Sequence, residues 1–497
     1  MSKRDANDVL RDEGPDALRA LYDEATADGS YQSQICADEM ADRGTEPHES
    51  DLRPPAFSDE ALALHFAERH ETDLRYVAAW GQWLRYDGRR WVFDHTLFAF
   101  DCARRICRAA AAKCNESSTA SIVASAKTVA AVERLARADR RLASTVEQWD
   151  TDPWLLNTPE AVIDLRTGVF RGHRPDDYLT RVTAVSPGGT CPIWRNFLAR
   201  ITDRDTEIEA FLQRACGYAL TGSTREQSLF FLFGTGANGK SVFLNTIAGV
   251  LGGYHRTAAI ETFAASTGER HPTDLAGLRG ARLVTATETE EGRRLAEARV
   301  KALTGGDRIS ARFMRQDFFE FQPQFKLFIA GNHRPRLRSV DEAIRRRFNL
   351  IPFTVAIPPG ERNKELAEQL KAEWSGVLAW MVEGCLEWQR SGLLPPKVVV
   401  EATADYLNSE DSIRAWLDDC CIRDPTALEP SAALFASWKG WAEQNSEFVG
   451  SMKSLSQTLQ DRGFERRRDR KGSGFLGLML KRDRGDGSHE QAYVQSP

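Results

Sequence analysis

Eight residues near the middle of the chain have the types and spacing needed to bind a chain of phosphates. Residues 234–241 read GTGANGKS and fit the pattern G-x-x-x-x-G-K-[ST] at every specified position. Glycines let the backbone turn so that successive N–H groups face a β-phosphate, while the lysine reaches the β and γ oxygens and the serine hydroxyl binds magnesium. We call this segment the glycine loop and predict that it binds ATP and Mg²⁺ through Gly234, Thr235, Gly236, Ala237, Asn238, Gly239, Lys240 and Ser241.

The sequence around the glycine loop supports this interpretation. An apolar run, LFFLF, precedes the loop, and an amphipathic stretch, VFLNTIAGVL, follows it. A strand, a glycine-rich turn and a helix N-terminus in that order form an anion site. A chance glycine-rich turn is the alternative, and this context disfavours it.

Acidic residues follow the next apolar run. The strand predicted over residues 283–287 ends in Glu288, and Glu290 lies two positions further on. A phosphate loop needs an acidic partner at the end of a neighbouring strand, which holds magnesium and polarises the attacking water. We assign Glu288 to metal binding or water activation and Glu290 as its partner. The alternative is a solvated acidic turn.

Polar residues at the ends of two further runs complete a candidate catalytic set with Lys240. Asn332 ends FKLFIAGN and could orient the attacking water, or it could simply form a turn. Arg345, Arg346 and Arg347 precede FNLIPF. An arginine presented across a subunit boundary can neutralise charge on the γ-phosphate, and we favour Arg347, then Arg346, for this role. An exposed basic face or a DNA contact is the alternative.

The segment between these runs predicts a hairpin that contacts nucleic acid. ISARFM and FFEF follow the tight turn TGGD, and the tip of the hairpin would hold Arg312, Arg315 and Gln316 beside Phe313. Cations next to an aromatic ring suit a loop that contacts phosphates and stacks on bases. A solvated turn is the alternative.

The elements that position these residues are predicted from the apolar pattern. Near-continuous apolar strands alternating with helical stretches over residues 228–353 favour a largely parallel sheet buried on both faces. Helices are expected at 57–70, 100–146, 194–220 and 363–390, and short strands at 75–94 and 154–172. The segment LLPPKVVV predicts a linker.

A smaller unit follows the linker, with three helices and then a glycine-turned pair of strands. This order suggests a winged helix, with MKSLSQTLQDR as the helix presented to a groove. The strand pair has a basic cluster that would meet phosphates, namely Arg466, Arg467, Arg468, Arg470 and Lys471. A helical packing domain with a solvated basic turn is the alternative.

Composition limits the class of protein. A chain of 497 residues with 42% hydrophobic residues should fold as two to four globular domains. A net charge of −5 does not mark the whole chain as a nucleic-acid binder. The nine cysteines show no C-x-x-C pair, so neither a zinc site nor a disulfide framework is expected. Without an apolar leader or a membrane-length run, we expect a cytoplasmic protein.

Seven segments in order resemble the helicase part of the phage and plasmid primase-helicases, a superfamily III helicase family related to the poxvirus primase-helicase. They are WLLNTPEAVIDLRTG, FLQRACGYALTG, FGTGANGKS, GARLVTATETEEGRRL, VKALTGGDRISAR, FEFQPQFKLFIAGNHRP and AIRRRFNLIPF. The resemblance is specific from about residue 152 to 353 and looser from 57 to about 480.

The resemblance implies an AAA+-like core that assembles into a hexameric ring, with ATP sites between subunits and DNA in the central pore. It implies that Lys301 and the hairpin with Arg312 and Arg315 contact DNA in the pore. The remaining roles that it implies fall on Gly239, Lys240 and Ser241 of the phosphate loop, Glu288 with Glu290 at the acidic strand end, Asn332 as the sensor and Arg346 or Arg347 as the finger.

The predicted fold is therefore α/β: a P-loop NTPase (AAA+-like) core with a parallel sheet, preceded by an α+β and helical region and followed by a winged helix. The predicted division is a disordered acidic tail (1–55), an N-terminal α+β region (56–190), a helical collar (191–225), the ATPase core (226–395) and a winged-helix DNA-binding domain (400–485). The segment before Ala56 is short and acidic, and 57–146 lacks a clustered Asp-x-Asp site, so we expect no primer synthesis.

The leading hypothesis is an ATP-dependent DNA helicase that acts as a ring in the replication of a phage, plasmid or integrated element. The alternative is an origin-binding initiator that uses ATP as an assembly switch. A protein-remodelling machine is a third interpretation, and it gives no reason for the basic strand pair. Salt-sensitive DNA binding separates it from the first two.

Overall fold

The computed structural model describes residues 54–265, 273–288, 294–313, 317–337, 340–445, 447–469 and 472–481. The chain divides into two compact units: residues up to 71 with 94–143 form unit 1, and 72–93 with the chain from 144 onward form unit 2. The acidic tail predicted for residues 1–55 lies almost wholly outside the described residues. Of the helices that are described, none has the length and apolar character to cross a membrane.

Unit 1 is mainly helical in its described part, which confirms the helix predicted for 57–70 and, as far as Ala136, those predicted for 100–146. The last part of that prediction is wrong, because Ala143–Ser144 form the short strand β4. Ser58 and Ser125 begin two of these helices, because their hydroxyls accept hydrogen bonds from the first-turn amides of Ala61 and Thr128. The helices of unit 1 are α4 (Asp59–His70), α5 (Phe98–Ala111), α6 (Ser117–Val123) and α7 (Ala126–Ala136).

Unit 2 begins with two small antiparallel sheets, where short strands were predicted. Gly81 and Gly88 lie in the turns between the first three strands with φ of 63° and 94°, a backbone conformation that favours glycine. The strands are β1 (Leu74–Val77), β2 (Gln82–Tyr86) and β3 (Trp91–Phe93), then β5 (Leu155–Asn157), β6 (Val162–Asp164) and β7 (Val169–Arg171).

A five-stranded sheet forms the centre of unit 2, and its strands lie in the order β14-β8-β13-β10-β9. Every neighbouring pair is parallel, so the predicted parallel sheet is confirmed. The short edge strand β9 was not predicted. The strands are β8 (Leu229–Phe233), β9 (His255–Thr257), β10 (Leu283–Glu288), β13 (Lys326–Gly331) and β14 (Phe348–Pro352).

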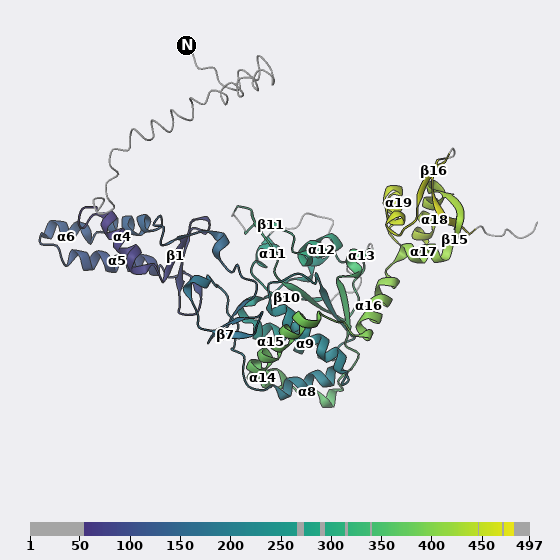
Figure 1. Cartoon of the computed structure of the whole chain (residues 1–497), viewed down its shortest axis with the longest axis horizontal. Coiled ribbons are helices and arrows are strands. Elements are labelled where there is room, and N and C mark those ends of the chain that lie inside the picture. Colours follow the sequence, from purple (N-terminus) through teal and green to yellow (C-terminus); the bar gives the residue numbers. More distant parts are fainter. Residues whose placement is uncertain are drawn as a thin grey trace, which may run out of the picture. The chain divides into compact units, whose positions relative to one another are not determined.

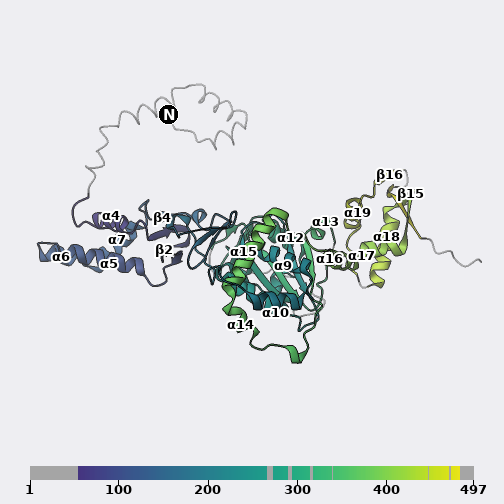
Figure 2. The ribbon, with the colours of Figure 1, turned by 60° about the horizontal axis from the view of Figure 1, so that its bottom comes forward.

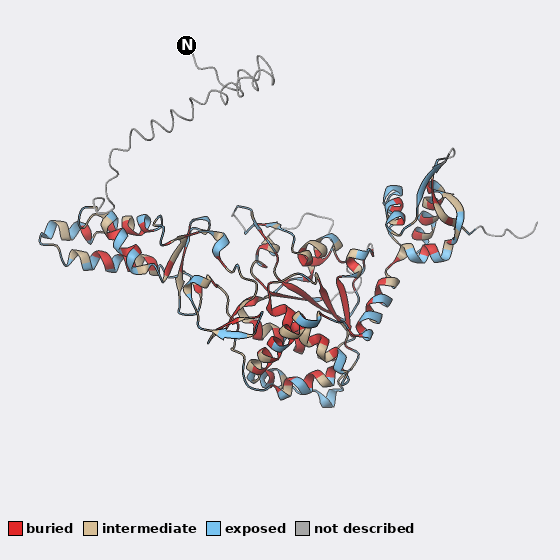
Figure 3. Cartoon of the chain, in the orientation of Figure 1, coloured by how far each residue is buried: buried red, intermediate tan, exposed pale blue. Residues whose placement is uncertain are grey.

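Helices cover both faces of this sheet, and alternate strand residues point to opposite faces. Phe230 and Phe328 pack with the helices of one face, and Phe231 and Ile329 pack with those of the other. Figures 1 and 2 show the two layers, and Figure 3 shows the strands as buried. The first face holds α8 (Pro192–Ile201), α9 (Thr206–Leu220), α10 (Lys240–Leu251), α14 (Leu366–Ala372) and α15 (Trp374–Ser391); the second holds α11 (Thr273–Ala276), α12 (Glu297–Gly305), α13 (Glu342–Arg345) and α16 (Lys397–Ser409).

Three of these helices bear on the predicted domain boundaries. Helices α8 and α9, predicted as a collar, share one hydrophobic cluster with the sheet. Helix α16 begins within the predicted linker and packs on β14, where the Thr403 hydroxyl accepts a hydrogen bond from Leu350 N at 2.9 Å. The collar role itself stays a prediction.

The last part of unit 2, residues 412–481, has its own hydrophobic cluster, and we call it the C-terminal segment. It contains the second and third predicted helices, the predicted strand pair and one strand, β15, that was not predicted. The first predicted helix, over residues 402–421, is wrong as a single element, because the chain breaks at Asp411 into α16 and α17. Pro425 and a register shift between Asp424 and Leu428 interrupt the strand pattern of β15. The elements are α17 (Ser412–Cys420), β15 (Cys421–Pro430), α18 (Ser431–Gln444), α19 (Met452–Asp461), β16 (Arg466–Asp469) and β17 (Gly472–Leu480).

Candidate functional site

The glycine loop connects the carboxyl end of β8 to the start of α10. Gly236 and Gly239 have φ of 108° and 85°, so the loop turns through a conformation that side chains disfavour. A Cβ atom at Gly234 would lie 2.1 Å from Asn238 Nδ2, and one at Gly239 would lie 2.6 Å from Ile201 Cγ2. The glycines are therefore needed both for the turn and for the close packing beneath it.

Lys240 lies at the centre of the site. Its ammonium donates to the carbonyl oxygen of Gly234 at 2.6 Å, to Asn238 Oδ1 at 2.9 Å and to Asn332 Oδ1 at 3.3 Å. Only 6% of the residue is exposed, and this burial lowers the pKa of the ammonium. The loop thus holds a desolvated cation between oxygen acceptors, an arrangement that favours an anionic ligand.

Sheet register brings two further predicted residues to the same edge. Gly331, the last residue of β13, pairs with Phe233 on one side and with Glu288 on the other. The glycine loop therefore starts level with Glu288 and with Asn332, which directly follows β13. Glu288 is 3% exposed and Asn332 is exposed. Carboxyl ends of parallel strands are where α/β sheets bind ligands.

The three consecutive arginines have three different environments. Arg347 is buried, donates from Nη1 to the carbonyl oxygen of Ala343 at 2.8 Å, and has a pKa lowered by burial and by Arg346. Arg345 is half-buried and Arg346 is exposed, with Nη2 3.0 Å from Gln227 Oε1. Of the three, Arg346 is the exposed residue.

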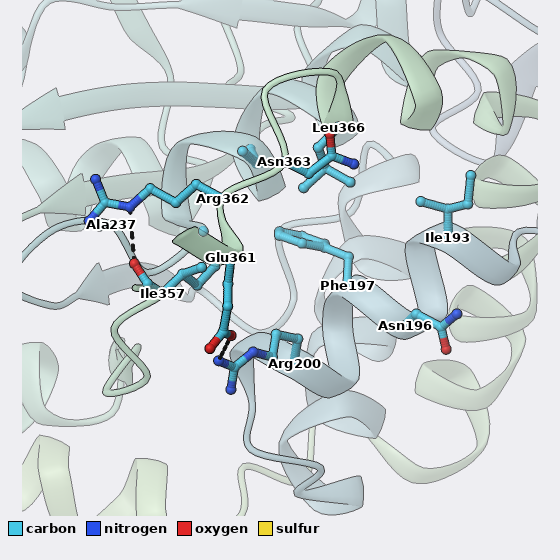
Figure 4. A pocket seen from close by; sticks show the side chains of 12 residues that line it. Ile193, Asn196, Phe197, Arg200, Ala237, Ile357, Glu361, Arg362, Asn363 and Leu366 are labelled. Carbon is cyan, nitrogen blue, oxygen red and sulfur yellow. Dashed lines mark hydrogen bonds and ion pairs between the residues drawn. The ribbon is translucent and has the colours of Figure 1, made fainter. Parts of the chain in front are cut away.

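A cavity of about 370 Å³ lies beside the glycine loop, and Figure 4 shows its lining. The Phe197 ring projects into it, and Arg200 and Glu361 form an ion pair of 2.6 Å at its edge. Ala237 and Gly239 of the loop also line it. The other lining side chains come from α8, α10 and the segment after β14, and are Ile193, Asn196, Val242, Ile357, Arg362, Asn363 and Leu366. Sequence reasoning missed this cavity because its walls are far apart in the chain.

The predicted hairpin is present as β11 (Ile309–Ala311) and β12 (Phe319–Phe321), an antiparallel pair. Arg312 lies near its tip with its guanidinium 4.7 Å from the centroid of the exposed Phe318 ring. Phe313 stacks on Phe319 at 5.6 Å. Cationic and aromatic side chains are therefore displayed together.

Lys301 is not part of the hairpin. It lies on α12, where its ammonium pairs with Asp341, the residue that caps α13. A DNA contact by Lys301 would have to compete with this ion pair.

In the C-terminal segment, the basic strand β16 presents Arg466, Arg467 and Arg468, which are exposed. Arg467 pairs with Glu465 at 2.9 Å, and Arg466 bonds Ser473 Oγ at 3.2 Å. Four predicted site residues lie outside the described residues, namely Glu290, Arg315, Arg470 and Lys471.

Comparison with known proteins identifies relatives of this chain. A family model described as "D5 N terminal like" matches residues 63–203, and a "Family of unknown function" (DUF5906) matches 232–347. The chain is 26% identical over 323 residues to a protein of Acanthamoeba polyphaga mimivirus named "Putative helicase". It is 24% identical over 264 residues to a protein of Frog virus 3 (isolate Goorha) with the same description. These matches support a phage and viral primase-helicase family for this chain.

The matches to these two proteins cover only part of each relative. They span 60% and 49% of this chain but 34% and 27% of the mimivirus and frog-virus proteins, so the chain spans about a third of their length or less. Among solved structures, the apo NrS-1 C terminal region is similar to 85% of this chain and 100% of its own, at 10% identity and a TM-score of 0.46.

Proposed function

We propose that this member of the primase-helicase family is an ATP-dependent DNA helicase that works as a ring in the replication of a phage, plasmid or integrated element. The observation that carries the proposal is the environment of Lys240. Its ammonium lies between the glycine loop and Asn332, at the sheet edge where Glu288 ends β10. A phosphate-loop fold of the AAA+ type needs these groups at one edge.

The cavity beside the loop supports ATP as the ligand. It opens next to Ala237 and Gly239 and is lined mainly by apolar side chains, including Phe197 and Ile357. An apolar wall with a few polar groups suits a nucleoside base, and about 370 Å³ is within the usual size of a ligand site. With the base held there, the phosphates would follow the loop toward Lys240.

The residues present also suit Mg²⁺. Ser241 is exposed on the first turn of α10, and Glu288 supplies a carboxylate at the adjacent strand end. Magnesium prefers a few oxygen ligands together with substrate phosphates. When bound, it would neutralise charge on the β- and γ-phosphates.

In this mechanism each residue of the chain has a separate task. Lys240 exchanges its contacts with Asn238 and Asn332 for phosphate oxygens, which leaves Asn332 able to orient the attacking water. Glu288 polarises that water. Arg346 of the neighbouring subunit completes the site, since it is exposed while Arg347 is buried. Arg347 was the favoured finger in the sequence interpretation, and we now assign this role to Arg346.

Two surfaces would contact DNA. The hairpin presents Arg312, Phe313 and Phe318, a combination suited to a single strand in the pore of a ring. The C-terminal segment has the order helix, strand, helix, helix, strand, strand, and we propose that it is a winged helix. Its α19 would then meet a groove while β16 meets phosphates.

ATP hydrolysis with and without single-stranded DNA tests the proposal, measured together with strand displacement on a forked duplex. We expect DNA-stimulated hydrolysis and unwinding in the parent, and loss of both in Lys240→Ala and Arg346→Ala. Arg346→Ala should still bind ATP, because its guanidinium acts in the next subunit. DNA binding without stimulated hydrolysis or unwinding would contradict the helicase proposal.

The origin-binding initiator remains the second candidate, because the arginines of β16 are exposed on a segment with its own core. An initiator would bind one duplex sequence far more tightly than others and would need ATP only to assemble. Competition between random duplexes and the element's own replication origin distinguishes the two candidates.

A further inference from the structure

We propose that Asp411 is a positioning residue that couples the C-terminal segment to the finger Arg346. One buried carboxylate holds both Arg345, the neighbour of the finger, and Arg462, at the end of α19. Nucleic acid bound by the C-terminal segment would therefore change the rate of ATP hydrolysis. This inference rests on the proposed function, and it adds the residue that connects the two sites.

The contacts of Asp411 are numerous for one side chain. Oδ2 accepts from Arg345 Nη2 at 3.2 Å, and Oδ1 accepts from Arg462 Nη2 at 2.5 Å. Oδ1 also accepts from the amide of Arg414 at 3.1 Å and so caps α17. Only 4% of the Asp411 side chain is exposed, which makes the carboxylate a buried charge that depends on its two cationic partners.

On the ATPase side, the contact is one residue away from the finger. Arg345 ends α13, and Arg346 is the C-cap residue of that four-residue helix. Arg345 Nη1 also lies 3.3 Å from Asn408 Oδ1 at the end of α16. The short helix is thus fastened to α16 and α17 through the arginine next to Arg346.

Residues at the same end of α16 also form hydrogen bonds with the segment between Asn332 and the finger. Glu410 Oε2 accepts from the amide of Leu337 at 2.9 Å, and the Tyr406 hydroxyl donates to the carbonyl oxygen of Pro335. The segment from the sensor to the finger is therefore bonded repeatedly to the residues just before the C-terminal segment.

On the nucleic-acid side, Arg462 is the C-cap of α19 and lies four positions before the basic strand β16. A movement of α19 or β16 on binding would change the bond between Arg462 and Asp411. Because both guanidiniums share one carboxylate, a change at Arg462 alters how firmly Asp411 holds Arg345. Placement of a catalytic cation is sensitive to such shifts, since a displacement of about 1 Å can lower a rate on the order of 100-fold.

The test measures ATP hydrolysis by the full chain, alone and at saturating single-stranded or forked DNA, in four variants. Arg462→Ala removes the C-terminal contact and leaves Arg345 on Asp411. Asp411→Asn keeps the cap of α17, because Asn caps as well as Asp, but removes the charge. Arg345→Ala frees the finger helix. The control is Asp418→Asn, which removes an exposed partner of Arg414 on the same helix.

We expect the ratio of DNA-stimulated to basal ATP hydrolysis to fall to about 1 in Arg462→Ala, because bound DNA can no longer act on Asp411 through Arg462. Arg345→Ala and Asp411→Asn should lower kcat about 10-fold and leave KM for ATP unchanged. Both changes displace the finger, which acts on the ATP of the neighbouring subunit, whereas each glycine loop binds the ATP of its own subunit. The control should match the parent. Saturating DNA removes any effect of weaker DNA binding.

A double-mutant cycle separates positioning from simple loss of folding. If Arg345 acts through Arg346, then Arg345→Ala should lower kcat no further in a chain that already has Arg346→Ala. Additive losses, or full DNA stimulation in Arg462→Ala, would overturn the coupling while leaving the helicase proposal intact. A parent chain that hydrolyses no ATP would overturn the proposed function and this inference with it.

Discussion

The parallel sheet has a buried lysine at each of its two ends, and the two lysines differ in what surrounds them. Lys240 follows the carboxyl end of β8 and is 6% exposed, and Lys326 begins β13 at the amino end and is 1% exposed. Burial lowers the pKa of both ammonium groups. A lowered pKa therefore does not distinguish a binding site from a structural one.

The hydrogen-bond partners make the distinction. Lys326 donates to the carbonyl oxygens of Thr221, Ser223 and Gln324, and its ammonium lies 4.5 Å from the centroid of the Tyr218 ring. These acceptors are backbone carbonyl oxygens, so Lys326 has a structural role at the C-terminal end of α9. Lys240 instead bonds two side-chain amides and one carbonyl of a glycine-rich turn beside an open cavity. A ligand can replace those partners.

The largest effect should come from Lys240→Ala. We expect ATP hydrolysis to fall about 1,000-fold, the scale of losing one preorganised charge donor at a reacting phosphate. Stability should change by less than about 1 kcal/mol, since the variant also removes a desolvated ammonium. Phosphate release and thermal unfolding measure the two quantities. A large loss of stability would mean that Lys240 has a structural role like that of Lys326, and the two ends of the sheet would then not differ in this respect.

Lys326→Met should do the opposite and lower the free energy of unfolding by roughly 3 kcal/mol, because buried carbonyls lose their donor. Denaturant unfolding measures this loss. Lys371→Met, at an exposed position of α14, is the matched control and should have no effect. A stable Lys326→Met chain without hydrolysis would mean that the amino end also serves catalysis.

Asn332→Ala sharpens the contrast at the carboxyl end. We expect hydrolysis to fall about 10-fold, because one hydrogen bond near the γ-phosphate is worth about 1.5 kcal/mol when its partner is charged. Asn445→Ala, an exposed asparagine that bonds Trp441 O at 2.8 Å, should leave hydrolysis unchanged. Equal rates in Asn332→Ala and the parent would exclude Asn332 as the sensor.

The smallest effect should come from His255 at the amino end, which begins β9 and has Nε2 2.8 Å from Thr285 Oγ1. Burial and Arg256 lower the pKa of His255 to about 4. The unfolded chain takes up a proton near pH 6.5, so stability is full above that pH and falls as pH drops toward 4. Partial exposure reduces the expected loss to about 1–2 kcal/mol. In His255→Gln, the free energy of unfolding should depend less on pH over this range. An unchanged slope of the free energy of unfolding against pH would contradict the assignment.

Much of the sheet could be predicted because its strands are buried on both faces. LFFLF, KLFIAG and FNLIP are continuous or nearly continuous apolar runs, and they correspond to β8, β13 and β14. LVTATE, which corresponds to β10, combines apolar residues with β-branched threonines. The strands β9 and β15 could not be predicted, since β9 has only three residues and β15 is interrupted by Pro425 and a bulge. Their positions depend on neighbours that are distant in the chain.

The glycine loop could likewise be predicted, because its geometry is encoded in consecutive residues. The different environments of the three consecutive arginines could not be predicted. RRR gives no local signal that Arg347 turns inward, Arg346 outward and Arg345 toward Asp411. Asp411 looked like one acid within a long helical pattern, and only tertiary packing reveals it as the break between α16 and α17.

We expect the carboxyl end of the sheet to bind ATP through Lys240. Calorimetric titration of ATP with Mg²⁺ tests it most directly, in the parent, in Lys240→Ala and in Lys439→Ala, an exposed lysine of α18. We expect one ATP per chain in the parent and in Lys439→Ala, with binding at least about 100-fold weaker in Lys240→Ala. Equal ATP affinity in all three chains would contradict it.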